Sequence, residues 1–178
     1  PPAAAAPAAS PASYVGAQVC KTCNEPEVKA WSGSHHDLAM QLATEASVRG
    51  DFANARFKYN GIVTSFFRRG DKFMVRTDGP DGKLADYEIS HAFGVYPLQQ
   101  YMVAFPGGRY QFLQHAWDAR AKSQGGQRWF HLQPGQKVDH QDPLHWTGLY
   151  QNWAHCTCFD PWEWHASQAT LISLKVVL

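Results

Sequence analysis

The chain has 178 residues, of which 44% are hydrophobic and 13% are aromatic. A chain of this length and apolar content can bury a core, which excludes disorder over its whole length. Its 16 Lys and Arg residues nearly balance its 15 Asp and Glu residues, and the net charge of +1 disfavours an electrostatic nucleic-acid binder. No apolar run reaches the ~20 residues of a membrane helix, so we expect no transmembrane segment.

The N-terminal part predicts a tether followed by helices. Residues 1–13 are a low-complexity run of Pro, Ala and Ser. Proline blocks helix formation and removes backbone donors, so this run is typical of an extended tether. Residues 14–50 predict a helical segment in two pieces. Pro26 stands between two glutamates, as in a first helical turn, and Ser34 is a suitable N-cap for a second helix.

Residues 51–133 predict an antiparallel β domain. Short β-prone runs alternate with turn signals such as the Gly-Pro-Asp-Gly run at 79–82. Phe73, Val75 and Thr77 recur with the period of two that is typical of a half-buried strand. The regular turn spacing favours a meander of roughly five to seven strands, folded into a sandwich or half-barrel.

The last segment, residues 134–178, is loop-like and rich in His and Trp. A long structureless stretch inside a compact domain needs something else to organise it, and a large planar cofactor would do so. The sequence as a whole therefore predicts an α+β chain. It would have short N-terminal helices, a central antiparallel β-meander and a C-terminal segment that folds around the cofactor.

Four cysteines form two close pairs, Cys20 with Cys23 and Cys156 with Cys158. The spacing of the first pair suits a redox dithiol or disulfide, a zinc site with two further soft ligands, or a covalently attached c-type haem. A haem motif reads Cys-x-x-Cys-His, because both thiols add to vinyl groups and the His ligates the iron. Asn24 stands where that His belongs, so the pair alone leaves all three alternatives open.

The sequence that follows the first pair resembles exported multihaem c-type cytochromes. Cys-x-x-Cys is followed by Trp-x-x-Ser-x-His, which ends at His36. In that family this His is typically a distal axial ligand to a haem; His35 is the adjacent candidate. The resemblance continues through blocks such as FGVYPLQQYMVAFPGGRYQFLQHAWDAR and DPLHWTGLYQNW, and covers about residues 14–153. Many relatives carry tetratricopeptide repeats after this region.

The haem-attachment motifs depart from the family pattern, so they are either degenerate or misread at these positions. The family expects a second Cys-x-x-Cys-His motif near residue 156, whereas this chain reads HCTCF at 155–159. The cysteine spacing is one residue short, and Phe replaces His. The resemblance implies that Cys20 and Cys23 form thioether bonds to haem c. It also implies that Cys156 and Cys158 mark a second attachment site.

The nine histidines supply further candidates for iron ligation. Besides the His-His pair, we name His145, His155 and His165, because imidazole is the commonest protein ligand of haem iron. His115 and His131 lie in strand-like sequence, and we expect them to be structural.

The resemblance implies electron transfer by covalently bound haem c, one to a few per chain, in a protein of the periplasm or cell exterior. Haem would then be the planar group that organises residues 134–178. Iron with two His ligands has no open position, which favours an electron carrier over a catalyst. Its partners would be redox proteins, further haem subunits or copies of the chain in a filament. The alternative is a secreted β-rich binding or structural module, whose cysteines form disulfides or jointly hold zinc.

Overall fold

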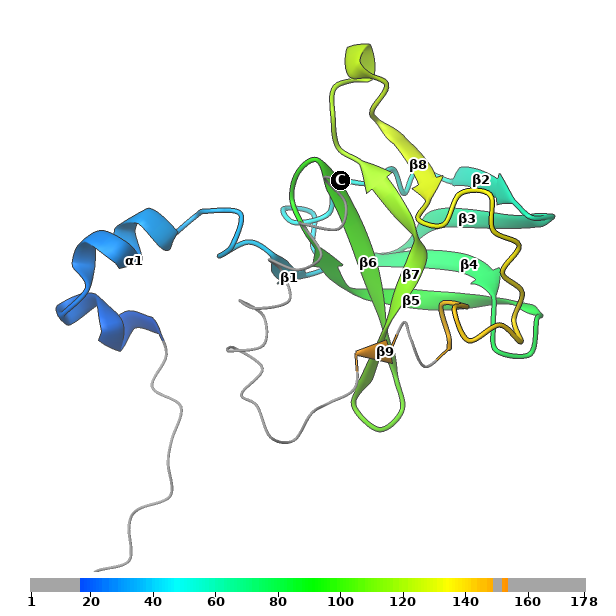
Figure 1. Cartoon of the computed structure of the whole chain (residues 1–178), viewed down its shortest axis with the longest axis horizontal. Coiled ribbons are helices and arrows are strands. Elements are labelled where there is room, and N and C mark those ends of the chain that lie inside the picture. Colours follow the sequence, from blue (N-terminus) through cyan, green and yellow to red (C-terminus); the bar gives the residue numbers. More distant parts are fainter. Residues whose placement is uncertain (1–16, 149–151, 154–178) are drawn as a thin grey trace, which may run out of the picture. The chain divides into compact units, whose positions relative to one another are not determined.

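The fold is that of a computed structural model, which describes residues 17–148 and 152–153. The chain divides into two compact units, Pro1–Ser34 and His35–Leu178. Helical turns make up the described part of the first unit, and an antiparallel sheet dominates the second (Figure 1). Among the described residues, no helix is long and apolar enough to cross a membrane.

The first unit contains a short 3-10 helix, η1 (Ala17–Thr22), and an α-helix, α1 (Glu25–Trp31). Pro26 suits the first turn of α1, where its missing N–H costs no hydrogen bond, and the flanking acids face the positive end of the helix dipole. The helix ends where the Ser32 hydroxyl donates to the Val28 carbonyl at 2.8 Å.

The prediction of an α+β chain with several N-terminal helices is wrong. The structure is mostly antiparallel β, with 43% strand and 10% helix, and α1 is the one α-helix among the described residues. The second helix expected after Ser34 does not form. A short strand, β1 (Met40–Leu42), lies there instead, because it pairs with a distant strand and sets Met40 opposite Phe93.

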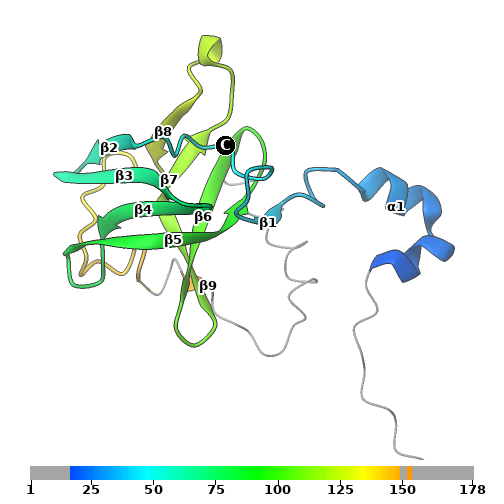
Figure 2. The same cartoon turned by 180° about the vertical axis from the view of Figure 1, so that it is seen from behind.

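The second unit is a meander of strands that follow one another in both sequence and space (Figures 1 and 2). In chain order these strands are β2 (Ala55–Tyr59), β3 (Ile62–Arg69), β4 (Lys72–Asp78), β5 (Leu84–Phe93), β6 (Leu98–Phe105), β7 (Arg109–Asp118) and β8 (Arg128–His131), with the 3-10 turn η2 (Lys122–Gln124) before β8. β1 pairs with β5, and β9 (Asn152–Trp153) pairs with β7.

Tight turns connect the first strands of the meander. Asn60 and Gly61 both have positive φ, +45° and +83°, which is the backbone of a two-residue hairpin turn whose twist matches that of the flanking strands. Gly70, at φ +59°, opens the two-residue turn between β3 and β4. These turns fix the register, in which Phe66 lies opposite Val75.

The meander curls into a nearly closed barrel, and β2 and β8 meet along a line that we call the seam (Figures 1 and 2). Among the described strands, no hydrogen-bonded ladder joins β2 to β8. Side chains connect the two edges instead, since the Tyr59 ring of β2 stacks on the His131 ring of β8 with centroids 4.0 Å apart. One strand further in, Phe66 of β3 stacks on Trp129 of β8.

Aromatic side chains fill the interior of the barrel. Phe52 packs edge-on against four buried rings at centroid distances of 5.0 to 5.8 Å; they are Phe66, Phe73, Tyr101 and Trp129. Such pairs add about 0.5–1.5 kcal/mol each beyond the area they bury. The barrel core is therefore built from the protein's own side chains.

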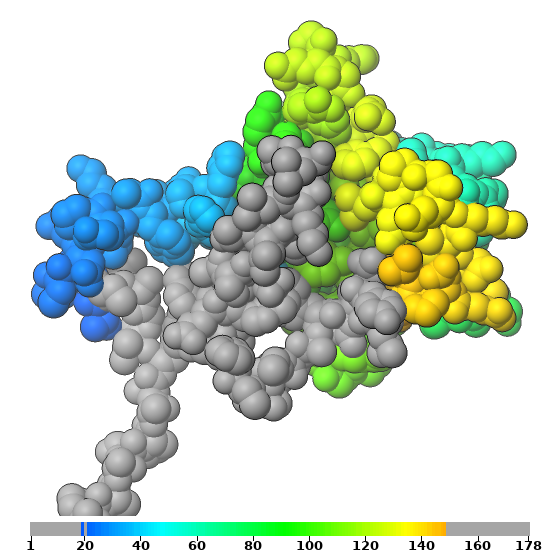
Figure 3. All heavy atoms as spheres, in the orientation of Figure 1, coloured from blue at the N-terminus to red at the C-terminus, as the bar shows by residue number. Residues whose placement is uncertain are grey.

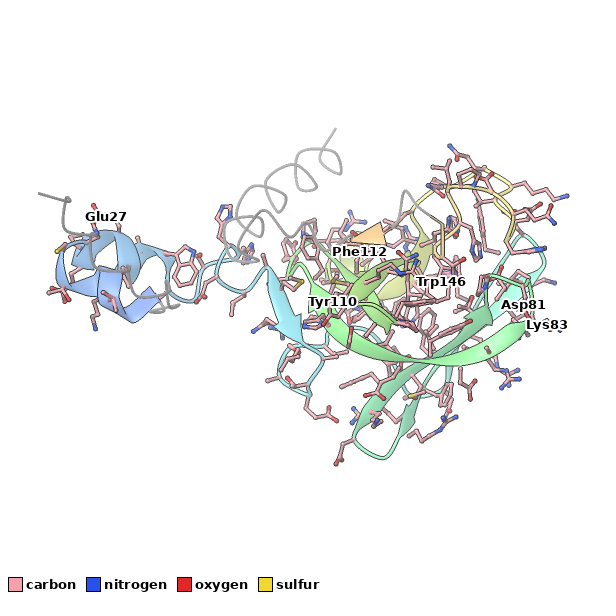
Figure 4. The ribbon with its side chains drawn as sticks, turned by 90° about the horizontal axis from the view of Figure 1, so that it is seen from below. Glu27, Asp81, Lys83, Tyr110, Phe112 and Trp146 are labelled. Atoms are coloured by element: carbon pink, nitrogen blue, oxygen red, sulfur yellow. The ribbon has the colours of Figure 1, made fainter. Side chains whose placement is uncertain are left out.

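A smaller apolar cluster surrounds buried Phe93 and Met102 on β5 and β6, with Phe112 on β7. Tyr110 and Phe112 project from the same face of β7, and their side chains lie next to each other (Figure 4). Met40 of β1 packs against the same cluster. This packing explains why residues 40–42 are held as a strand.

Candidate functional site

The first cysteine pair lies in the helical N-terminal unit. Cys20 is within η1, and Cys23 follows η1 directly, two residues before α1 begins. The thiol of Cys23 is free and exposed. Asn24 is exposed beside it. A free exposed thiol remains available for a covalent bond.

The described part of this unit has no core of its own. No residue of α1 is buried, Val28 and Trp31 are only half-buried, and Val19 is 58% exposed. An isolated helix of this length is not stable in water, because nucleation is costly and few hydrogen bonds follow. Within the described residues of this unit, the apolar side chains of Val19, Val28 and Trp31 therefore keep part of their surface exposed.

His35 and His36 lie at the start of the second unit, in the turn before β1. Both side chains are exposed. The backbone carbonyl of His36 accepts a hydrogen bond from Ala39 at 3.3 Å, which shapes the turn and leaves the imidazole uninvolved.

A loop that we call the strap, residues 133–148, crosses one end of the barrel. Its yellow and orange atoms lie together beside β2 and β3 (Figure 3). The Tyr59 hydroxyl donates to the Gln133 carbonyl at 2.8 Å, and the Asn60 amide donates to the Gln136 carbonyl at 2.7 Å. Side chains of the barrel thus satisfy backbone groups of the strap.

Trp146 anchors the other half of the strap. Its indole N–H donates to the Asp78 carbonyl at 2.7 Å, and its ring packs edge-on against Tyr87 and Phe105. Figure 4 labels Trp146 and, at the turn between β4 and β5, Asp81 and Lys83. The ring of Trp146 is part of the barrel core.

His145, which we predicted as an iron ligand, is 1% exposed and has a partner on each ring nitrogen. Nε2 lies 3.1 Å from Asp78 Oδ2, and Nδ1 lies 2.8 Å from Thr147 Oγ1. Burial alone would raise the pKa of Asp78, but the hydrogen bond and charge of His145 outweigh it and hold this pKa below its ordinary value. His145 could bind a metal only by giving up one of these partners.

Asp78, His145 and Thr147 follow the order acid, base, hydroxyl of a hydrolase triad. The His145 ring is buried, however, so a substrate cannot reach it. The Thr147 backbone N–H also points at His145 Nδ1, at 3.3 Å. We therefore interpret the three residues as a structural clamp on the strap.

A chain of buried hydrogen bonds leads from Asp78 into the barrel. Thr77 Oγ1 donates to Asp78 Oδ1 at 3.1 Å, and Thr77 Oγ1 lies 3.0 Å from Thr64 Oγ1. Thr64 Oγ1 lies 3.4 Å from His115 Nε2. Together with His145, this series of hydrogen bonds crosses the interior of the barrel from the strap to β7.

His115 and His131 line the same interior, with ring centroids 5.5 Å apart. Burial, with a smaller contribution from His131, lowers the pKa of His115 to about 3, and burial also lowers the pKa of His131. Both rings are therefore neutral at pH 7, as the apolar surroundings require.

Among the described residues, no group of three His, Cys, Asp or Glu side chains is arranged to hold a metal ion. The remaining predicted site residues, Cys156, Cys158, His155 and His165, lie outside the described residues. Sequence reasoning missed Asp78, which is the last residue of β4.

No family model matches the chain, and neither a curated protein nor a solved structure matches it. The resemblance to multihaem cytochromes therefore stays a prediction from sequence.

Proposed function

We propose that this chain transfers electrons through covalently bound haem c, as an exported multihaem cytochrome or part of one. One observation supports the proposal most. The free exposed thiol of Cys23 lies in a helical unit whose described residues bury no side chain of their own. A haem joined to Cys20 and Cys23 would cover apolar side chains that stay partly exposed among the described residues of this unit, such as Val19 and Val28.

The thiols fit this group, whereas the residue after them does not. Asn24 offers a carboxamide, which does not replace the imidazole of a complete attachment motif. His36 or His35 would therefore supply an axial ligand, to this haem or to a neighbouring one; both side chains are exposed. His155 and His165 remain candidates. His145 is the weakest candidate, because Asp78 and Thr147 already occupy its ring nitrogens.

When bound, the haem would supply one-electron exchange between Fe(III) and Fe(II). The protein would set the potential through axial ligands and burial. Cys156 and Cys158 would mark a second attachment site. We place the protein in the periplasm or outside the cell, where haem attachment and export would bring it. Redox proteins, further haem subunits or copies of this chain in a filament would be its partners.

The test is a visible absorption spectrum of the full chain, made in a host that attaches haem c. We expect a Soret band, α and β bands after dithionite reduction, and colour that survives acid–acetone extraction. The double variant Cys20→Ser, Cys23→Ser should lose the contribution of this haem. Thr22→Ser, a change between the two cysteines, is the matched control and should keep it. A wild-type chain without visible absorbance would contradict the proposal.

Axial ligation has its own test in the same protein. His36→Gln and His35→Gln should differ, because the ligand variant opens a coordination position and changes the iron from low to high spin. Electron paramagnetic resonance of the oxidised protein reads this change directly. If both variants keep the wild-type spectrum, neither His ligates the iron.

The alternative is a secreted β-rich binding or structural module. The aromatic core of the barrel favours it, since this unit buries its own side chains and needs no cofactor to fold. Such a protein would be colourless. Metal analysis and a count of free thiols would then separate a zinc site from disulfides.

A further inference from the structure

The hydrogen-bond chain that ends at Asp78 has a fixed direction. An ionised carboxylate only accepts hydrogen bonds, so the single hydroxyl proton of Thr77 goes to Asp78 Oδ1. Thr77 Oγ1 must therefore accept from Thr64 Oγ1, 3.0 Å away. The hydroxyl proton of Thr64 is used in that bond.

The direction of the chain fixes the tautomer of His115. Thr64 Oγ1 has no proton left to donate, so it accepts from His115 Nε2, 3.4 Å away. The ring is neutral, because burial lowers the pKa of His115 far below 7. A neutral imidazole carries one N–H, which is then on Nε2. Nδ1 is left as a bare acceptor.

Three buried polar atoms of β7 lack hydrogen-bond partners among the described residues, namely Oε1 of Gln111, Nδ1 of His115 and Nε1 of Trp117. We consider the last two, whose residues are 7% and 6% exposed. The two residues are two positions apart, so both project to the same side of the strand. The imidazole nitrogen needs a donor, and the indole N–H needs an acceptor.

We infer that a water molecule binds inside the barrel between His115 and Trp117. It would accept the indole proton of Trp117 and donate to Nδ1 of His115. The Cα atoms of residues two positions apart on a strand lie about 7 Å apart, whereas two hydrogen bonds of about 2.9 Å through one water span at most about 5.8 Å, so one water joins the two nitrogens where both side chains lean toward each other. A metal cation does not fit, because it cannot accept the indole proton.

The bound water extends the polar chain across the barrel, from Trp117 through His115, Thr64 and Thr77 to Asp78. Buried waters typically satisfy polar groups of this kind and are part of the fold. Their bonds also strengthen one another in a low-dielectric interior. This inference concerns the barrel alone and does not depend on the haem proposal.

The test is nuclear magnetic resonance on the full ¹⁵N-labelled chain at pH 7, in the reduced state if haem is bound. A correlation through the imidazole ring should report His115 as the Nε2–H tautomer. The indole proton of Trp117 should show a cross-peak to water in a rotating-frame experiment. Trp117→Phe should remove that cross-peak, whereas Trp31→Phe, a change in α1, should leave it.

Two variants test the direction of the hydrogen-bond chain from His115 to Asp78. Thr64→Val keeps the side-chain shape but removes the acceptor for Nε2–H, so the His115 signals should change to another tautomer or a mixture. Thr64→Ser keeps the hydroxyl and should retain the wild-type pattern. Amide spectra of the sheet report folding for each variant. An Nδ1–H tautomer in the wild type would overturn the assigned direction. A correct tautomer without the water cross-peak would overturn the water site.

Discussion

Acid should destabilise the barrel through His115. Burial lowers the pKa of this residue to about 3 in the folded protein, from an ordinary value of 6.5. The unfolded chain therefore takes up a proton here as the pH falls below about 6.5, and the folded chain does not until about pH 3. Stability from the buried neutral ring is fully present above pH 6.5 and is lost as the pH falls through this window.

The size of the effect follows from the two protonation states. At pH 5 the unfolded chain is almost fully protonated at His115 and the folded chain is neutral there, which costs about 2 kcal/mol relative to pH 7. His131 adds a change of the same sign, because burial also lowers its pKa. Asp78 stays ionised at pH 5, since its pKa is held below the ordinary 3.8.

Urea unfolding followed by Trp fluorescence, at pH 7 and at pH 5, measures this loss. The variant His115→Gln carries no titrating group at this position and should lose about 2 kcal/mol less than the wild type between the two values. His140→Gln, a change in the strap beside Gly82, is the control and should follow the wild type. If His115→Gln loses as much stability as the wild type, the assigned cause is wrong.

Three further predictions concern the clamp, the core and the thiol. Asp78→Asn should lower the free energy of unfolding by about 2–3 kcal/mol, because it removes the carboxylate charge that pairs with buried His145. Urea unfolding at pH 7 measures this loss, and an unchanged midpoint would contradict the clamp. Gly50→Ala should cost about 1–3 kcal/mol in the same assay, because its Cβ would lie 2.6 Å from the Tyr101 hydroxyl oxygen. Native Cys23 should react with maleimide in colourless protein and resist it in haem-loaded protein, as mass spectrometry of the peptide would show; equal labelling would refute thioether attachment there.

Local sequence signals predicted individual strands better than they predicted which distant residues contact one another. Phe73, Val75 and Thr77 are all buried on β4 while Arg76 is exposed, as the period of two predicted, but Met74 is buried as well and breaks the alternation. The Gly-Pro-Asp-Gly turn signal at 79–82 lies between β4 and β5. Both features depend on neighbouring residues, so a short stretch of sequence contains the information. The closing of the sheet into a barrel is a global property that no single stretch encodes.

The two main errors have the same physical origin. Residues 40–42 were predicted within a helical segment, but pairing with residues 91–93 of β5 makes them a strand. The pattern around His145 gave no sign of Asp78, which lies 67 positions earlier in the chain. In both cases a long-range contact decides the local structure. The cysteine pair differs, because its spacing is local and its chemistry could be proposed from sequence.

The seam between β2 and β8 is where local opening of the barrel should begin. Elsewhere backbone ladders join the neighbouring strands of the meander, whereas ring stacking of Tyr59 on His131 connects these two edges. Stacked rings separate without breaking a ladder, so the smallest cooperative opening of this unit should begin here. Amide protons of β2 and β8 that face the seam would exchange before those of β5 and β6. The same opening gives solvent a route to the interior, and its frequency would set the residence time of any water held there.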